Sequence, residues 1–231
     1  MDKLAELIAY IEVSVRRYLE VSEKIWTYEG PPDSRYPHAL LTAGPHSNGY
    51  VDVGNLLKQN PQTRENISRF MLEVLSEVWQ GHFTRVVGAD TSSTALAHEI
   101  ASIYGVDYIR MVKTTTGDQV WNPGNKPLTD EDLILQVEDL ITTGESSLKV
   151  RETIRAQHPG RHIQFVPFLP VVVDRSDPDN RVTMIDDSKV LPLLKLNIKT
   201  FQPDNCDYCR AGSEAIRPRE SNNWNRLTRK I

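Results

Sequence analysis

Apolar residues recur along this chain in two patterns, one typical of helices and one typical of buried strands. A spacing of three and four residues over 3–25 predicts an amphipathic helix, and the same spacing predicts a second helix that starts at Asn60-Pro61 and ends at Gly81. Short apolar runs predict strands at 85–89, 106–112, 133–137, 163–168 and 171–173. Because strands and helices alternate, we expect an α/β fold with a central, mainly parallel sheet flanked by helices.

The stretch 133–147 combines a strand, an acidic pair and a small polar loop before a helix. Glu138 and Asp139 follow the apolar run, and Ser146 or Ser147 starts the helix. The loop consists of Thr142, Thr143, Gly144, Glu145 and Ser146. Carboxylates at a strand end can accept bonds from ribose hydroxyls, whereas loop N–H groups over a helix N-terminus suit a phosphate. The pattern fits either a ribose phosphate site or a loop that only caps its helix, and spacing alone does not favour the first.

A second strand, loop and helix repeat this arrangement. The loop residues Asp90, Thr91, Ser92 and Ser93 follow the strand at 85–89 and precede a helix over 94–104. Small hydroxyl residues and N–H groups at a helix N-terminus favour an anion. The alternative is an ordinary helix cap, for which Ser and Thr are common choices.

Two other segments lack helical spacing. Short β-like runs at 39–42 and 50–53 flank a Gly-Pro-His-Ser-Asn-Gly turn, which predicts a small hairpin. Residues 113–127 form a long polar segment without periodicity. Loops of this length in a compact domain are often lids, and an ordinary hairpin loop is the alternative.

Composition and charge argue against a nucleic-acid-binding, a membrane-spanning or a secreted protein. The chain has 27 Lys and Arg residues against 31 Asp and Glu residues, and this formal net charge of −4 excludes a general affinity for nucleic acid. No apolar run is long enough to span a membrane, and the N-terminal residues lack the features of a secretory signal. We therefore expect a cytoplasmic protein. Its length suggests one domain at 1–200, which includes an N-terminal helix and hairpin at 1–60, and a C-terminal extension at 201–231.

The two cysteines, Cys206 and Cys209, are too few for a disulfide-built scaffold. A single Cys-x-x-Cys pair is half of a tetrahedral zinc site. The missing Zn2+ ligands would come from His158 and His162 or from a second subunit. The alternative is that both cysteines are free or structural.

Residues 133–147 resemble the phosphoribosyl-pyrophosphate motif of the type I phosphoribosyltransferases, which consists of an apolar strand, two acidic residues and a Thr/Gly/Ser loop. The segment at 39–53 resembles the N-terminal hood hairpin of the orotate phosphoribosyltransferases. The matching positions there are Gly44, Ser47, Tyr50 and Asp52. Asp174-Arg175 follows a predicted strand and is similar to the Asp-Arg pair by which that family supplies an arginine to the pyrimidine.

The chain departs from the family pattern at several places. Ser47-Asn48 replaces the family's Ser-Pro, and Glu138 replaces the usual first Asp of the acidic pair. Thr42 stands where the hood hairpin usually has a lysine, and Ser92-Ser93 stands where the pyrophosphate loop commonly has two glycines. The segment that corresponds to the family's mobile loop lacks a histidine, because the chain has none between His98 and His158.

The resemblance implies a pentosyltransferase that joins the anomeric carbon of phosphoribosyl pyrophosphate to orotate or a similar base and releases pyrophosphate. It also implies Mg2+ held mostly by substrate oxygens, and a homodimer. The implied catalytic residues are Glu138 and Asp139, which would hold the ribose hydroxyls and face the developing cation. The implied 5-phosphate site is the loop from Thr142 to Ser146. The implied pyrophosphate site consists of Asp90, Thr91, Ser92, Ser93, Arg110 and Lys113. The implied base site consists of Thr42, Tyr50 and Arg175.

Two other functions stay open. One is a diverged protein of this fold that binds phosphoribosyl ligands as a sensor or regulator. Thr42, Ser92-Ser93 and the histidine-free loop favour it, whereas the intact Thr-Thr-Gly-x-Ser loop and Arg175 oppose it. The other is a phosphoribosyltransferase that acts on a different base.

Overall fold

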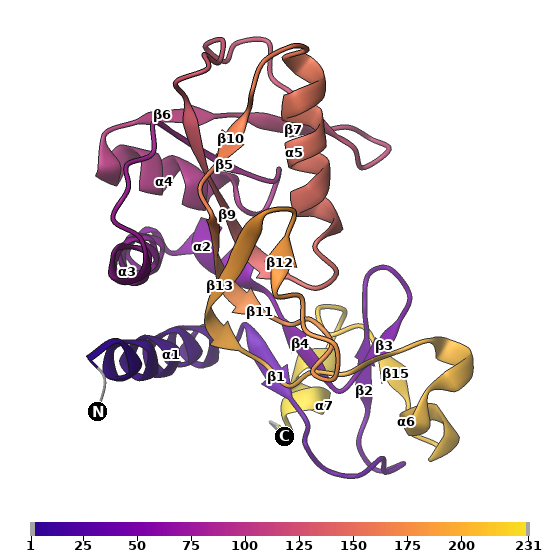
Figure 1. The fold of residues 1–231 in the computed structure, drawn as a ribbon. Coiled ribbons are helices and arrows are strands. Elements are labelled where there is room, and N and C mark those ends of the chain that lie inside the picture. The colour runs from indigo at the N-terminus through magenta and orange to yellow at the C-terminus, as the bar shows by residue number, and fades with distance from the viewer. Residues whose placement is uncertain (1–2, 230–231) are drawn as a thin grey trace.

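The computed structural model describes residues 3–229, and a seven-stranded sheet forms its centre (Figure 1). The strands follow the order β12-β13-β11-β9-β5-β6, and β10 pairs with part of β9. Their bounds are β5 (Arg85–Gly88), β6 (Asp107–Ile109), β9 (Leu133–Ile141), β10 (Gln164–Phe165), β11 (Phe168–Asp174), β12 (Met184–Ile185) and β13 (Ser188–Lys195). All pairs are parallel except β12–β13. The predicted α/β fold with a mainly parallel sheet is confirmed.

Helices cover both faces of this sheet because β9 is apolar on both sides. The long helices are α1 (Lys3–Val21), α3 (Pro61–Val78), α4 (Thr94–Tyr104) and α5 (Glu145–Gln157). Leu135 packs in the large core cluster with residues of α1, α3 and α4, whereas the neighbouring Ile134 packs with Val150 and Ile154 of α5. Successive side chains of a strand point to opposite faces, so this alternation seats three helices on one face and α5 on the other. No helix within residues 3–229 has the length and apolar character needed to cross a membrane.

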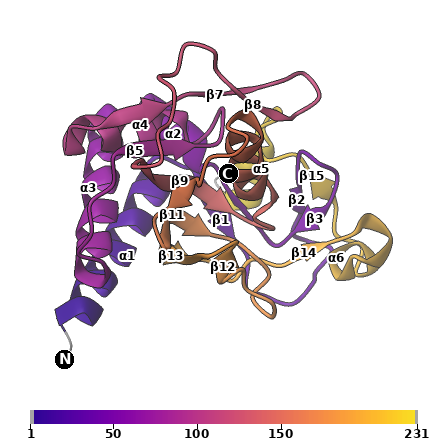
Figure 2. The ribbon, with the colours of Figure 1, turned by 45° about the horizontal axis from the view of Figure 1, so that its top comes forward.

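A second sheet of four strands lies on the side of the molecule away from α1 and α3 (Figures 1 and 2). Its order is β14-β3-β2-β15, with bounds β2 (His38–Leu40), β3 (His46–Ser47), β14 (Thr200–Phe201) and β15 (Ala215–Ile216). The β2–β3 hairpin occupies the centre, and the C-terminal segment supplies both outer strands. Residues 200–201 and 215–216 thus belong to the same sheet as the N-terminal hairpin.

The predicted pairing of 39–42 with 50–53 is wrong. Ala39 pairs with Ser47, because the chain already reverses over 41–45, where Gly44 has a φ of 102° that favours glycine. Tyr50 instead pairs with Trp26, in a separate two-stranded sheet of β1 (Ile25–Thr27) and β4 (Gly49–Val51).

Residues 106–112 were predicted as one strand and form two. The run divides between β6 in the central sheet and β7 (Met111–Lys113), which pairs with β8 (Gln119–Trp121) as an antiparallel hairpin. The polar segment at 113–127 therefore contains the turn and second strand of a hairpin. The remaining elements are short: α2 (Val53–Gln59), η1 (Pro203–Asn205), α6 (Asp207–Arg210) and α7 (Asn223–Thr228).

Candidate functional site

The acidic pair lies inside β9 and not after it. The strand continues to Ile141, so Glu138 and Asp139 are only 3% and 5% exposed. The prediction ended the strand at 137 because charged residues rarely occupy a buried strand. Here the Ser93 hydroxyl lies 2.7 Å from Glu138 Oε2 and 3.0 Å from Asp139 Oδ1, and the Asp139 N–H donates to that same hydroxyl oxygen. Polar partners inside the fold thus permit the burial.

Glu138 belongs to a buried hydrogen-bond network. Its Oε1 accepts from the Ser147 hydroxyl at 2.9 Å and from the Gln136 amide at 3.3 Å. Gln136 in turn accepts from Arg151 Nε at 2.7 Å. Burial, with a further contribution from the neighbouring carboxylate, raises the pKa of Glu138 to about 7, and burial also raises the pKa of Asp139.

Asp139 lines a polar cleft of about 420 Å³, which we call the acidic cleft. The residues that line it include Asp52, Gly54, Asn55, Lys58, Ser92, Asp139, Thr142 and Ser146. Thr142 and Ser146 come from the polar loop after β9, and Ser146 lies in the first turn of α5. The structure therefore joins one predicted acid and part of the predicted phosphate loop at a single opening, above the N-terminus of a thirteen-residue helix.

Gly144 shapes the loop before α5. Its φ of 81° lies in the left-handed region, and a Cβ there would come within 2.3 Å of Ile185 Cδ1. The helix begins at Glu145, one residue earlier than predicted, because this glycine acts as its N-cap with no side-chain cap bond. The N-cap residue offers no side chain to the first N–H groups of α5. The Glu145 N–H donates to Thr143 Oγ1 at 3.4 Å, and the N–H groups that follow it are suited to a phosphate.

The opposite wall of the acidic cleft is α2, which the sequence pattern did not reveal. Seven residues are too few to show a helical period, but Asp52 is a recognisable cap whose carboxylate accepts from the Asn55 N–H at 3.3 Å. A Cβ on Gly54 would lie 3.3 Å from both Asp139 Oδ2 and Ser92 Cβ, so the helix backbone passes close to the acid. Lys58 brings a cation to this wall.

The predicted pyrophosphate residues separate in the structure. Ser92 lines the acidic cleft, whereas Ser93 is fully buried beneath the acidic pair. Asp90 accepts from the Thr94 hydroxyl and from the Lys113 N–H, both at 3.0 Å, which ties the loop to the β7–β8 hairpin. Thr91, Arg110 and Lys113 are exposed and lie outside the lining of the acidic cleft.

A second opening of about 360 Å³, the arginine cavity, adjoins the acidic cleft, and Thr142 lines both. Its lining residues are Leu41, Ala43, Pro45, Thr142, Thr143, Arg175, Asp177 and Thr200. Arg175 follows β11, at the strand end where it was predicted. Its Nη2 donates to Thr200 Oγ1 at 3.3 Å, its Nε is buried without a partner, and burial lowers its pKa. Within the described part of the chain no carboxylate forms an ion pair with this guanidinium.

Thr42 and Tyr50 are not brought together with Arg175. They line a separate cavity with Arg217, Pro218 and Arg219 of the C-terminal segment. Tyr50 packs against Trp224 with ring centroids 6.3 Å apart. The tip of the β2–β3 hairpin reaches the arginine cavity through Leu41, Ala43 and Pro45, which are apolar residues that the sequence analysis did not single out individually.

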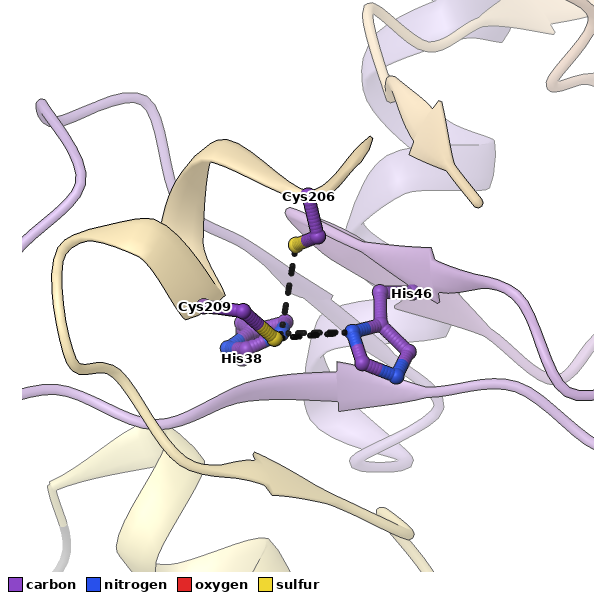
Figure 3. Close-up of side chains that lie close together, drawn as sticks. All are labelled: His38, His46, Cys206 and Cys209. Atoms are coloured by element: carbon purple, nitrogen blue, oxygen red, sulfur yellow. Dashed lines mark hydrogen bonds between the residues drawn. The ribbon is translucent and has the colours of Figure 1, made fainter. Parts of the chain in front are cut away.

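Cys206 and Cys209 lie beside His38 and His46, and not beside His158 and His162 (Figure 3). His158 instead donates from its Nδ1–H to the Ile154 carbonyl oxygen at 2.8 Å, and its ring packs on Trp121. The pairing of the C-terminal segment with β2 and β3 brings the two histidines to the cysteines.

Known proteins are similar to this chain in sequence and in fold. The orotate phosphoribosyltransferase of Caldanaerobacter subterraneus subsp. tengcongensis is 30% identical over 183 residues, which cover 78% of this chain and 87% of that protein. The enzyme of that name from Desulforamulus reducens is 28% identical over 187 residues, with the same coverage. No family model matches the sequence.

Two solved structures have a similar fold. The orotate phosphoribosyltransferase of Aeropyrum pernix superposes with a TM-score of 0.56 at 18% identity and covers 78% of this chain and 92% of its own. The Mycobacterium tuberculosis orotate phosphoribosyltransferase, solved with inorganic phosphate, superposes with a TM-score of 0.52 at 18% identity and covers 83% of this chain and 96% of its own.

Proposed function

The chain belongs to the type I phosphoribosyltransferase family, among relatives of the orotate phosphoribosyltransferases, and we propose that it transfers a 5-phosphoribosyl group from phosphoribosyl pyrophosphate to orotate, with release of pyrophosphate. The observation that carries this proposal is the pair of adjoining openings that share Thr142. One is polar and holds an acid over a helix N-terminus. The other combines apolar residues of the β2–β3 hairpin with a guanidinium that has no ion-pair partner among residues 3–229.

The phosphoribosyl group would occupy the acidic cleft. Its 5-phosphate would bind at the N-terminal N–H groups of α5 and the hydroxyls of Thr142 and Ser146. Asp139 would accept the ribose hydroxyls, because it is the member of the acidic pair that lines the cleft. We assign Glu138 a positioning role, through its bonds to Ser93 and Ser147.

Breaking the bond between the anomeric carbon and the pyrophosphate leaves positive charge on the ribose and negative charge on the leaving group. Asp139 would stabilise the first charge, while Lys58 of α2 and the Ser92 hydroxyl would stabilise the second. The oxygen donors of this cleft suit Mg2+, which would bind mainly to substrate oxygens and neutralise the pyrophosphate. Fixed charges, without a covalent nucleophile, would then suffice for catalysis.

Arg110 and Lys113 would contribute to pyrophosphate binding only from a neighbouring subunit. Both residues are exposed near or on the β7–β8 hairpin and lie outside the acidic cleft of their own chain. We propose a homodimer in which this hairpin reaches the partner's cleft. Cross-linking and light scattering test the dimer, and Lys113→Ala subunits mixed with Asp139→Asn subunits would regain activity if the two residues act in different chains.

Orotate is the favoured base because of the environment of Arg175. A planar guanidinium matches a carboxylate with two parallel donors, and the apolar walls suit a flat ring. A neutral purine would leave the charge without a partner, which argues against a purine as the base. The sensor or regulator alternative is supported by Ser93, a serine in the pyrophosphate loop that is committed to the acidic pair.

A direct assay separates these functions. The purified protein is incubated with phosphoribosyl pyrophosphate, Mg2+ and either orotate or uracil, which lacks the carboxylate, and the loss of the base is followed by absorbance and chromatography. We expect orotate to be consumed and uracil to be a poor substrate. Binding of phosphoribosyl pyrophosphate without consumption of any base would favour the sensor, and consumption of adenine in place of orotate would favour another base.

A further inference from the structure

Four side chains that could bind a metal ion meet between the β2–β3 hairpin and the C-terminal segment (Figure 3). His38 lies on β2 and His46 on β3, while Cys206 precedes α6 and Cys209 lies within it. One ligand atom from each residue falls within 4.8 Å of the other three. His38, His46 and Cys206 are at most 8% exposed.

The distances between these atoms fit a tetrahedron around zinc. Bonds of about 2.3 Å to sulfur and about 2.0 Å to nitrogen place two nitrogens about 3.3 Å apart and a sulfur and a nitrogen about 3.5 Å apart. His38 Nε2 lies 3.1 Å from His46 Nδ1. It also lies 3.5 Å from Cys206 Sγ and 3.6 Å from Cys209 Sγ, and Cys209 Sγ lies 3.2 Å from His46 Nδ1.

Hydrogen bonds behind His38 orient its lone pair toward this centre. The Ser213 hydroxyl donates its one proton to the Tyr36 carbonyl oxygen at 2.6 Å, because a carbonyl can only accept. Because that proton is used, Ser213 Oγ can only accept from His38, so the His38 Nδ1–H donates to it at 2.8 Å. The neutral imidazole then carries no proton on Nε2, the atom that faces both cysteines. A backing hydrogen bond of this kind is usual for histidines that bind zinc.

We propose that His38, His46, Cys206 and Cys209 bind one structural Zn2+. Two thiolates and two neutral imidazoles neutralise the ion, and four protein ligands leave no open position for substrate. The zinc ion would join His38 to Cys206, which are separated by 168 positions in the sequence. It would clamp the C-terminal segment to the β2–β3 hairpin, whose tip at 41–45 supplies one wall of the arginine cavity.

The site can be tested by metal content, independently of any catalytic activity. Protein purified under reducing conditions without chelator should contain about one zinc per chain by elemental analysis. Double substitution of Cys206→Ser and Cys209→Ser should remove it, whereas double substitution of His158→Ala and His162→Ala, as a matched control outside the cluster, should retain it. Equal zinc content in these two variants would overturn the proposal.

Metal titration of the wild-type protein tests the same site even if the cysteine variant does not fold. The wild-type protein is stripped with a chelator, reduced and titrated with Co2+, which should give a thiolate-to-metal charge-transfer band and tetrahedral d–d bands that Zn2+ abolishes. Ser213→Ala should weaken zinc binding about tenfold or more, because the backing bond to His38 is lost. The assignment would be refuted if the reduced protein bound neither Co2+ nor Zn2+. It would also be refuted if the cysteines formed a disulfide and the protein still bound no metal after reduction.

Discussion

The buried carboxyl of Glu138 makes a prediction about the pH dependence of stability. Its pKa in the folded protein is raised from 4.5 to about 7, chiefly by burial. A carboxyl with a raised pKa stabilises the folded state fully at pH values below 4.5, and this contribution is lost as the pH rises through 7. At 1.36 kcal/mol per pH unit, the free energy of unfolding should fall by about 3 kcal/mol over that window.

The substitution Glu138→Gln isolates this contribution. The amide has the shape of the protonated carboxyl and can donate to Ser93 Oγ, while its oxygen still accepts from Ser147 and Gln136. The variant carries no charge at this position at any pH. Its free energy of unfolding should therefore lack the decrease with rising pH that ionisation of Glu138 causes. The difference in the free energy of unfolding between wild type and variant should change by about 2–3 kcal/mol between about pH 5 and about pH 8.

Urea unfolding of both proteins, followed by circular dichroism at several pH values without substrate, measures this difference. Glu65, an exposed partner of Arg69 on the helix surface, provides a matched control, since Glu65→Gln should shift stability by less than about 0.5 kcal/mol at every pH. Parallel wild-type and Glu138→Gln curves across the pH range would refute the reasoning, because they would show that burial leaves the protonation of this carboxyl unchanged.

The remaining predictions concern the proposed site. Asp139→Asn should lower kcat at least about 100-fold with an unchanged unfolding transition, because the charge that faces the ribose cation is lost; a near-normal rate would exclude Asp139 from catalysis. Arg175→Lys should raise KM for orotate about tenfold or more and leave KM for phosphoribosyl pyrophosphate unchanged, because one of two paired donors is removed; equal changes in both constants would contradict a base-specific role. Gly144→Ala should cost more than about 1 kcal/mol of stability in thermal unfolding, because of its positive φ and its contact with Ile185. A control at Gly105, which also has a positive φ but no neighbour within 4 Å of a Cβ, separates the backbone effect from the steric clash.

Continuous stretches of sequence were sufficient to predict the fold and the family. The motif at 133–147 holds its strand, acidic pair and loop within fifteen consecutive residues, so spacing alone expresses its geometry. Alternating strands and helices likewise predict the parallel sheet, because each element carries its own periodicity. Short elements escaped this reasoning: α2 has only seven residues, and the β2–β3 turn closes several residues earlier than expected because of Gly44.

The sequence by itself determined the central sheet, its helices and the resemblance to the phosphoribosyltransferases, because these depend on local patterns. Only the tertiary structure decided which distant side chains share a site. It placed Asp139 at the acidic cleft and Glu138 in the buried network behind it, and it separated Tyr50 from Arg175. It also replaced the expected histidine partners of Cys206, because the pairing of β14 and β15 with the β2–β3 hairpin depends on contacts across more than 150 residues, which no local spacing encodes.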